Sequence, residues 1–395
     1  MPPTLPTLRL YAALVLATLL ASSAVPTPLY RLYQEQLGLS TPVLTLIFAV
    51  YAFTLLGSLL VFGSLSDYLG RKPVLLGALA INAAAMAIFL TADSGAALIA
   101  ARAVQGIAVG AAMTTVSAML LDSDRVNGPL LNSVTPMLGL AVGALSAGLA
   151  IHYAEAPAHV LFGLLLAITV AQALALSALP ETAPRRVGAL ASLRPRIHVP
   201  HAARSTLIRI TPVNIAIWGL GGFVLSLGPS MVREALHMSA PLIGTAIVSA
   251  LPLSAAIAIF AVRNRTAGMA LRAGSSILPL GVAVILTGVG LESAAFLFIG
   301  SIVSGTGFGI GFSGMLRTLL PLAEPDERAG LLAAYFVEAY LAFGVPAIAA
   351  GLAAPRLGLI MTTYLYGGGL IVLAIISFAA ITKSRLNPPN THGVS

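Results

Sequence analysis

The sequence predicts an all-α membrane protein with twelve transmembrane helices in two six-helix repeats. Of its 395 residues, 58% are hydrophobic and only 9% are Asp, Glu, Lys or Arg, whereas a soluble domain carries about 25% charged residues. So few charges cannot cover a water-facing surface, and a disordered chain needs the opposite composition. The apolar stretches are continuous and lack the alternation of an outer-membrane β-barrel. A bundle of membrane-spanning helices is the class that fits.

Twelve apolar windows are each long enough to be a membrane span. A hydrocarbon core of about 30 Å takes about 20 residues of helix. Turn residues such as Gly70, Gly128 and Pro180 fall between the windows. The predicted spans are 9–29, 42–62, 73–91, 96–120, 129–152, 159–179, 208–231, 240–262, 268–290, 294–320, 329–352 and 358–382.

The basic residues predict the orientation of these spans. With the N-terminus in the cytoplasm, most of the 21 Lys and Arg residues lie in cytoplasmic segments, and the outer loops hold Arg31, Arg233 and Arg356. The sequence therefore predicts a multi-pass protein of the cell (inner) membrane with both termini cytoplasmic. The net charge of +8 follows from this bias, so no nucleic-acid partner is expected.

The longest hydrophilic stretch, 180–207, divides the chain into two halves of six spans. The predicted domains are an N-terminal six-helix bundle (1–180), a cytoplasmic linker (181–207) and a C-terminal six-helix bundle with a short tail (208–395). Weak internal similarity supports this division, because Gly106 and Gly110 in the fourth span match Gly305 and Gly309 in the tenth. Two repeated six-helix halves are typical of carriers that work by alternating access.

The sharpest local pattern lies between the second and third spans. Gly63, Asp67, Gly70, Arg71 and Lys72 follow one another there within a single loop. We expect the two glycines to let helix ends approach closely and turn tightly. An aspartate beside the start of a helix is favoured by the helix dipole. Without the glycines, these charges would indicate only a loop at a membrane surface.

The fourth span adds Arg102, Gln105 and Gly106. Together with the loop at 63–72, this pattern resembles the motifs of the major facilitator superfamily, and within it the proton-coupled drug-efflux branch. The resemblance implies a secondary transporter in the lipid bilayer, not an enzyme. It also implies a small-molecule substrate, the proton gradient as the energy source, no cofactor and a monomeric state.

The resemblance further implies a conformational latch. In the family, the loop aspartate, here Asp67, pairs with the motif's arginine and contacts the start of the eleventh span, here near Ala329 and Gly330. By position, Asp122 at the inner end of the fourth span could join Arg71 in a charge cluster. Such a latch would hold the halves closed on the cytoplasmic side and release as they rock apart. The predicted latch residues are Gly63, Asp67, Gly70, Arg71, Lys72 and Asp122.

Three ionisable residues fall within spans, where a charge is costly. Glu338 is the one acidic residue of 13 that lies deep in the bilayer. Its neutral form is favoured there, so we predict that it couples protons or binds substrate. A fixed salt bridge to Arg102 and a counter-charge for a cationic substrate are the alternatives. Arg102 is linked in the family to proton transfer, and its alternative is to hydrogen-bond neighbouring helix carbonyls.

Other side chains could line a cavity around these charges. The predicted cavity-lining residues are Gln105, Asn214, Trp218, Tyr335 and Arg317. Tyr335 and Glu338 are three residues apart and share a helix face. Core or lipid packing is the alternative for the aromatic residues. Arg317 lies near the inner end of the tenth span, where its alternative is to reach water.

Patterns for soluble-enzyme chemistry are absent from the sequence. There is no cysteine, no phosphate-binding loop that would point to ATP, and no paired histidine spacing for a metal. Catalytic and metal-binding residues are therefore not expected.

Proton-driven antiport that exports small amphipathic compounds by alternating access is the function we predict. Glycines of the fifth span, Gly139, Gly143 and Gly148, resemble a motif associated with antiporters. The family's Gly-Pro pair is missing, however, because Pro136 follows Thr135, and small residues also allow close helix packing. One alternative is a proton symporter or facilitator for uptake of a small solute. Another is a transport-dead membrane sensor or lipid-handling protein.

Overall fold

The computed structural model describes residues 5–237, 241–324 and 327–383, which are helical and contain no strand. Twelve of the helices are long and apolar enough to cross a membrane, which confirms the predicted fold class. The first helices are α1 (Leu5–Ala24), α2 (Pro26–Leu37), α3 (Thr41–Phe62), α4 (Ser66–Leu69), α5 (Arg71–Leu90), α6 (Gly95–Ser123), α7 (Gly128–Tyr153) and α8 (Pro157–Leu176). The others are α9 (Ala189–Ser192), α10 (His201–Leu236), α11 (Pro241–Ala261), α12 (Ala267–Gly290), α13 (Ala294–Leu319), the 3-10 helix η1 (Leu320–Leu322), α14 (Arg328–Leu357) and α15 (Leu359–Lys383).

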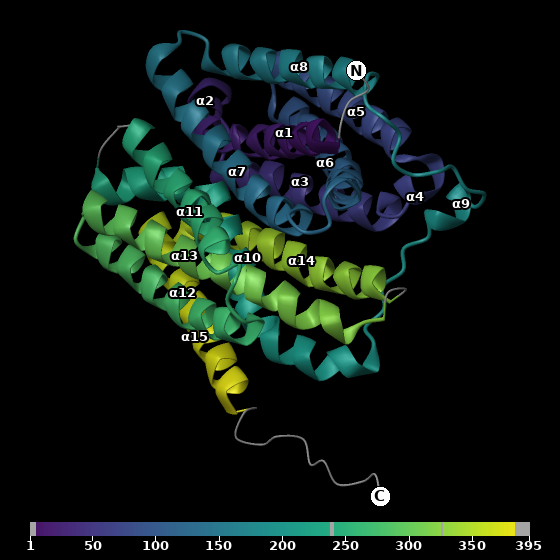
Figure 1. Cartoon of the computed structure of the whole chain (residues 1–395). Coiled ribbons are helices and arrows are strands. Elements are labelled where there is room, and N and C mark those ends of the chain that lie inside the picture. Colours follow the sequence, from purple (N-terminus) through teal and green to yellow (C-terminus); the bar gives the residue numbers. More distant parts are fainter. Residues whose placement is uncertain (1–4, 238–240, 325–326, 384–395) are drawn as a thin grey trace, which may run out of the picture.

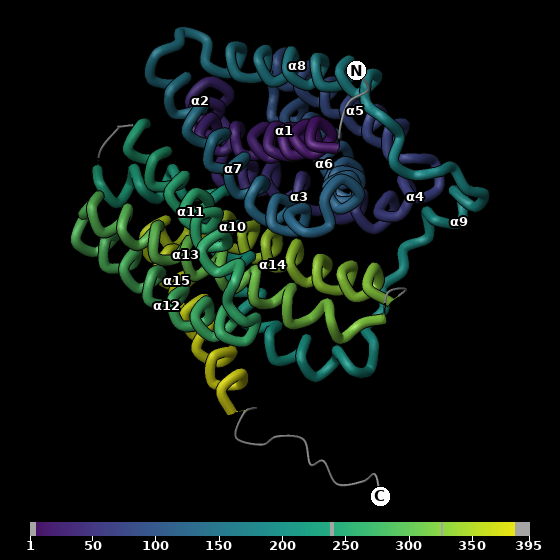
Figure 2. Tube along the Cα trace, viewed as in Figure 1, coloured from purple at the N-terminus to yellow at the C-terminus, as the bar shows by residue number. Residues whose placement is uncertain are grey.

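The helices form two groups. Helices α1 to α8 lie together in the upper part of Figure 1, and α10 to α15 lie together below them. The linker leaves α8, passes α4 and α9, and then enters α10, as the tube in Figure 2 shows. We call the end of the bundle where α8 ends and α10 begins the linker end, and the opposite end the distal end.

Two helices differ from their predicted spans. The first span runs from Leu5 to Leu37 over 33 residues and is broken at Val25, because Pro26 and Pro28 lack the N–H groups that would continue the helix. Helix α10 begins at His201, so part of the predicted linker is helical. The predicted C-terminal tail beyond Lys383 lies outside the described residues.

The internal repeat is confirmed by the way glycines bring helices together. A Cβ at Gly106 of α6 would lie 2.6 Å from the carbonyl oxygen of Tyr51, and one at Gly305 of α13 would lie 2.2 Å from that of Leu251. One turn further along, the same relation holds at 2.5 and 2.3 Å for Gly110 with Leu55 and for Gly309 with Ala255. Helix α6 therefore packs on α3 as α13 packs on α11, with no room for a side chain at these positions.

The two halves touch at the distal end through contacts that follow the same repeat. A Cβ at Gly351 of α14 would lie 2.1 Å from Oγ1 of Thr45 on α3, and one at Gly148 of α7 would lie 2.0 Å from Oγ1 of Thr245 on α11. Thr27 adds a hydrogen bond of 2.6 Å from its hydroxyl to the carbonyl of Leu225. Beside these contacts, a cleft of about 230 Å³ separates α2 and α7 from α10 and α11. The distal end is thus closed where threonine and glycine meet.

Hydrophobic cores fill both groups of helices. One core occupies the first half and extends onto α14 through Tyr340 and Phe343, and a second occupies the other half. Trp218 of α10 and Phe336 of α14 pack against both cores. The region around α10 and α14 therefore lies where the two halves meet.

Candidate functional site

Glu338 lies inside the bundle on α14. It is ten residues past Arg328, which places it about 15 Å along the helix from the linker end. Its Oε1 accepts a hydrogen bond from Nδ2 of Asn214 and its Oε2 accepts one from the hydroxyl of Thr211, each at 2.9 Å. Both donors belong to α10 and both are neutral. Among the described residues, no lysine, arginine or histidine forms an ion pair with this carboxylate.

Arg102 is not the partner of Glu338, so the alternative of a fixed salt bridge between them is wrong. Arg102 is completely buried within the first half. Its Nη1 donates to the carbonyl of Ser23 at 2.9 Å, and its Nη2 donates to the hydroxyl of Tyr30 at 2.7 Å. The guanidinium also lies over the ring of Tyr51, 4.9 Å from the centroid. Aromatic faces and neutral oxygens, rather than a carboxylate, stabilise this charge.

Arg102 and Gln105 hold the break between α1 and α2. In a continuous helix, the carbonyl of Ser22 would accept from the N–H of residue 26, which is proline and has none. Nε2 of Gln105 replaces that donor at 3.0 Å, while its Oε1 accepts from Arg102 at 2.9 Å. Both residues therefore donate hydrogen bonds to buried backbone carbonyls beside the break in the first span.

The predicted cavity-lining residues differ in their burial. Trp218 is partly buried between the two cores, and Asn214 is buried against Glu338. Gln105, Asn214 and Tyr335 are completely buried, so none of the three lines an open cavity in this conformation. Tyr335 instead accepts a hydrogen bond from Nε1 of Trp218 at 3.4 Å. Tyr335 and Glu338 both face α10, as their spacing predicted.

Arg317 does not line a cavity either. It is exposed at the linker end of α13. Its guanidinium donates to the carbonyls of Val262 at 3.3 Å and of Arg265, both in the loop between α11 and α12. A long cationic side chain near a helix end can extend to water in this way, and here it fixes a loop.

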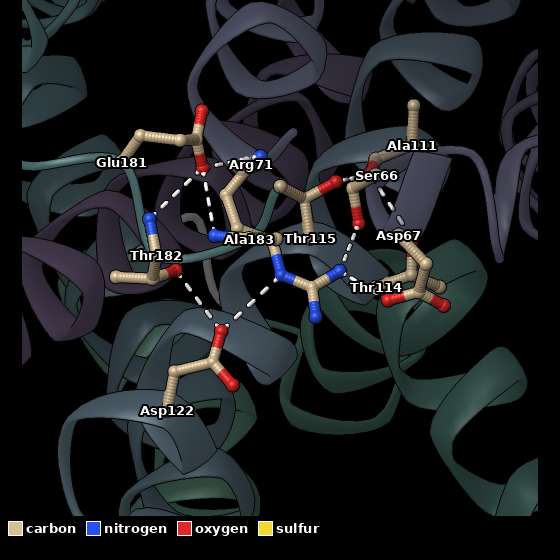
Figure 3. Close-up of polar contacts among 10 residues, drawn as sticks. All are labelled: Ser66, Asp67, Arg71, Ala111, Thr114, Thr115, Asp122, Glu181, Thr182 and Ala183. Carbon is tan, nitrogen blue, oxygen red and sulfur yellow. Dashed lines mark hydrogen bonds and ion pairs between the residues drawn. The ribbon is translucent and has the colours of Figure 1, made fainter. Parts of the chain in front are cut away.

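The charge cluster at 63–72 is built around Arg71, the first residue of α5 (Figure 3). Its Nε donates to Oδ2 of Asp122 on α6 at 3.3 Å, and its Nη1 donates to the hydroxyl of Ser66 at 2.8 Å and to the carboxylate of Asp67. The side chain of Arg71 is only 11% exposed. The structure thus places Asp122 beside Arg71, within the first half.

Glu181 completes this cluster, and sequence reasoning missed it. Its carboxylate accepts from the backbone N–H group of Arg71 at 2.8 Å (Figure 3). It also accepts from the backbone N–H group of Lys72 at 3.1 Å. An anion at the start of a helix is stabilised by the free N–H groups and the dipole. Since Glu181 is 110 residues away along the chain, the only sequence signal is an acidic residue directly after Pro180.

The two loop glycines have different reasons to be glycine. Gly70 has φ of +95°, a conformation that favours glycine, and a Cβ there would lie 2.7 Å from Oε2 of Glu181. Gly63 lies in a tight turn closed by the hydrogen bond from the N–H of Leu65 to the carbonyl of Phe62, as expected, but its φ of −55° does not require glycine. A Cβ at Gly63 would instead lie 2.5 Å from the carbonyl oxygen of Leu59.

The predicted latch to the second half is not formed in this structure. Lys72 donates to the carbonyl of Leu179, just beyond the end of α8, at 2.6 Å. Among the described residues, Asp67 has its ion pair with Arg71 and none with α14. The neighbour of Gly330 is His198 of the linker, whose backbone N–H donates to the carbonyl of Gly330 at 3.3 Å. The linker, rather than the aspartate, contacts the start of α14.

No metal centre emerges from the part of the chain that the structure describes, because no three His, Cys, Asp or Glu side chains are grouped to hold an ion. The candidate site has two parts. One is the carboxylate of Glu338 with its neutral hydrogen-bond donors on α10, and the other is the cluster of charges around Arg71 at the linker end. Such an arrangement suits binding and conformational change.

Comparison with known proteins identifies the class. The family model described as Major Facilitator Superfamily matches residues 10–337, so the chain belongs to this superfamily of membrane transporters. A comparison with curated protein sequences found no match.

Solved structures show the same fold. A bacterial homologue of the human lysosomal transporter Spinster, in an inward-facing and unoccupied conformation, is similar with a TM-score of 0.76 at 14% identity over 98% of this chain and 100% of that one. The nucleoside transporter NupG has a TM-score of 0.69 at 15% identity over 95% and 99%. The human organic anion transporter MFSD10 has 0.68 at 18% identity over 95% and 100%. At these identities, the likeness concerns the fold alone.

Proposed function

We propose that this protein is a monomeric proton-coupled antiporter that exports small amphipathic compounds, with the linker end and both termini in the cytoplasm. The observation that carries the proposal is the setting of Glu338, whose carboxylate has two neutral donors and no cation among the described residues. Glu338 is partly buried, and burying a carboxylate without a cation beside it is costly. Its neutral form is therefore favoured when the site closes, and it can lose a proton when the site opens to water.

The surroundings of Glu338 support an amphipathic substrate. Trp218 packs against Tyr340 with ring centroids 5.3 Å apart and against Phe343 at 5.9 Å, and it also lies near Phe308 at 6.4 Å. Aromatic walls with one carboxylate suit a lipophilic compound, because a sugar needs many more hydrogen-bonding side chains. Aromatic faces also attract organic cations.

Rocking of the two halves supplies the alternating access. The distal end is closed by Thr45 on Gly351 and Thr245 on Gly148, so release to that side requires both pairs to separate. The proton gradient provides the energy, as no other energy source is implied by the residues present.

Proton flux in proteoliposomes tests the proposal. A pH-sensitive dye is trapped inside, a pH gradient is imposed, and compounds are added to the wild type, to Glu338→Gln and to the control Glu234→Gln, which changes an exposed acid at the distal end. The panel holds lipophilic cations and neutral drugs, together with a nucleoside and an organic anion because two similar structures carry those names. We expect a compound to dissipate the gradient with the wild type and the control but not with Glu338→Gln.

The same assay separates the alternatives. Protons and compound moving in the same direction would indicate a symporter, and compound moving without protons would indicate a facilitator. Equal proton coupling in the wild type and Glu338→Gln would make Glu338 structural. A protein that moves no compound of the panel would favour the transport-dead sensor or lipid-handling protein.

A further inference from the structure

The linker between α8 and α10 exposes apolar side chains outside any membrane span. Val187 is 100% exposed, Leu190 is 84% exposed and Ile197 is 54% exposed. The only helix here, α9, has four residues and cannot cross a bilayer. A single exposed apolar side chain is ordinary on a surface, but three of them within residues 187–197 of one loop indicate a surface that another phase or molecule covers.

The charges of this segment all have one sign. Between residues 182 and 209 there is no Asp or Glu. The exposed arginines of the stretch are Arg185, Arg186, Arg194, Arg196, Arg204 and Arg209. The nearest carboxylate along the chain is that of Glu181, and it already accepts hydrogen bonds from the N–H groups at the start of α5. The orientation rule for membrane proteins explains the basic residues, yet it does not explain the apolar residues between them.

The backbone of the linker is attached to both halves. In the first half, the N–H of Arg186 donates to the carbonyl of Tyr68 at 2.8 Å, and the hydroxyl of Ser64 donates to the carbonyl of Ser192 at 3.2 Å. At its other end, His198 bonds to Gly330 of the second half. These bonds hold the inner side of the linker on the protein and leave the apolar and basic side chains exposed. In Figure 1, α9 accordingly lies at the edge of the molecule beside α4.

We propose that the linker surface formed by residues 185–197 docks onto the headgroups of anionic lipids in the leaflet at the linker end. Val187 and Leu190 insert at the boundary between headgroups and acyl chains, and the arginines bind the phosphates. Clusters of basic residues next to a membrane span bind anionic headgroups, and apolar side chains among them can be buried at the boundary with the acyl chains. Anionic headgroups attract such a segment electrostatically.

Docking of this surface has a consequence for rocking. The linker bonds to Tyr68 in one half and to Gly330 in the other, so lipid that holds the linker resists relative motion at the linker end. The anionic content of the leaflet is therefore expected to change the rate of conformational exchange. This inference concerns lipid contact and does not depend on the proposed substrate or on proton coupling.

A fluorescent probe at one position tests the proposal directly. The sequence has no cysteine, so Leu190→Cys introduces a unique site for an environment-sensitive dye. The labelled full-length protein is reconstituted in phosphatidylcholine vesicles with and without phosphatidylglycerol. We expect a blue-shifted emission, quenched by lipids brominated near the headgroup, in the anionic vesicles only. Salt at about 1 M should reverse the shift, because screening then acts over about 3 Å.

Two controls make the result specific. Val126→Cys places the same dye on a residue that is 85% exposed in the loop between α6 and α7, beside Asp124 and at the same end. Its emission should not depend on phosphatidylglycerol. Arg194→Gln with Arg196→Gln should abolish the shift at position 190, whereas Arg263→Gln with Arg265→Gln, an equal loss of charge at the linker end, should leave it.

Three outcomes would overturn the proposal. One is the same emission at position 190 in neutral and anionic vesicles. Another is an equal loss of the emission shift in the two double variants, Arg194→Gln with Arg196→Gln and Arg263→Gln with Arg265→Gln. The third is a probe that is shielded only in native membranes and never in pure lipid vesicles, since that result would assign the surface to a protein partner.

Discussion

In the first half of the chain, α6 packs on α3 through Gly106, and in the second half α13 packs on α11 through Gly305. The loops next to these pairs, from α3 to α5 and from α11 to α12, occupy equivalent places in the repeat. They are held in different ways. In the first, Arg71 at the end of the loop binds the carboxylates of Asp67 and Asp122. In the second, Arg317 of α13 binds only backbone carbonyls of the loop.

This difference shows which parts of the repeat are constrained. Helix packing at a shared glycine is the same in both halves because any side chain there would collide with backbone. The loops have no such requirement. A backbone carbonyl neither titrates nor changes partner easily, so the second loop is fixed, whereas carboxylates can exchange their cation as the halves move. The ionic contacts suited to switching therefore lie in the first half.

The largest expected effect comes from filling the distal contacts. Gly148→Val and Gly351→Val each place a side chain where a Cβ would already lie 2.0 or 2.1 Å from a threonine hydroxyl. Overpacking costs about 1–3 kcal/mol, so we expect transport in proteoliposomes to fall by about tenfold or more because the distal end cannot close. A cysteine introduced into the cysteine-free protein at the distal cleft, by Ser230→Cys, should react faster with a thiol reagent in both variants.

A glycine in open space controls for the substitution itself. A Cβ at Gly57 of α3 would have no atom of another residue within 4 Å, so Gly57→Val should transport normally. Because the two distal contacts are related by the repeat, Gly148→Val and Gly351→Val should reduce transport to a similar extent. A large effect at one position and none at the other would show that the halves do not close symmetrically.

The next effect distinguishes the two loops. Arg71→Ala removes a guanidinium that is 11% exposed and leaves Asp67 and Asp122 without it, and hydrogen bonds to charged groups contribute about 1.5–3 kcal/mol. Arg317→Ala removes the bonds of an exposed guanidinium to backbone carbonyls, and competition with water reduces what such exposed bonds contribute. We expect the melting temperature of the purified protein to fall further for Arg71→Ala. Equal losses would mean that the ionic and carbonyl contacts are equivalent.

The smallest effect is a pH dependence at the loop between α6 and α7. The backbone N–H and side-chain amide of Asn127, with the N–H of Val126 and the guanidinium of Arg9, hold the pKa of Asp124 well below its usual value. A lowered pKa in the folded state adds stability that is complete above about pH 4 and is lost as the pH falls. Asp124→Asn should therefore lower the melting temperature at neutral pH, with a difference from wild type that shrinks below about pH 4.

The corresponding loop of the second half gives the comparison for this prediction. Glu327 lies 3.7 Å from Nε2 of His198 and both side chains are partly exposed, so solvent screens this contact. Glu327→Gln should accordingly have little effect at neutral pH. A difference between wild type and Asp124→Asn that stays constant from neutral to acid pH would show that the charge of Asp124 is not what stabilises its loop.

Local features of the sequence predicted much of the site. The glycines and charges at 63–72 identified the cluster, and Asp122 was placed beside Arg71 from its position at the end of a span. The depth of Glu338 followed from counting residues along a helix. Pro26 and Pro28 also carried a signal, since two prolines near the end of an apolar run predict a broken helix, and that signal was missed.

Contacts between distant segments could not be predicted in the same way. Glu181 binds the start of α5 across 110 residues, and no local pattern encodes that distance. The burial of Gln105 and Tyr335 depends on how their helices are rotated in the packed bundle. A helix that is apolar on all sides does not show from its sequence which face packs inward. The separation of Arg102 from Glu338 likewise depends on which half each residue packs in.

The sequence by itself determined the membrane class, the number of spans and the superfamily, because the bilayer demands long apolar helices and the loop motif is local. It also determined the repeat, since glycines must stand wherever two backbones approach closely. Only the tertiary structure decided which charges meet, which carbonyls Arg102 and Gln105 satisfy, and that Glu338 faces neutral donors. Those outcomes depend on helix rotation and on contacts between segments far apart in the chain, and packing of the whole bundle sets both.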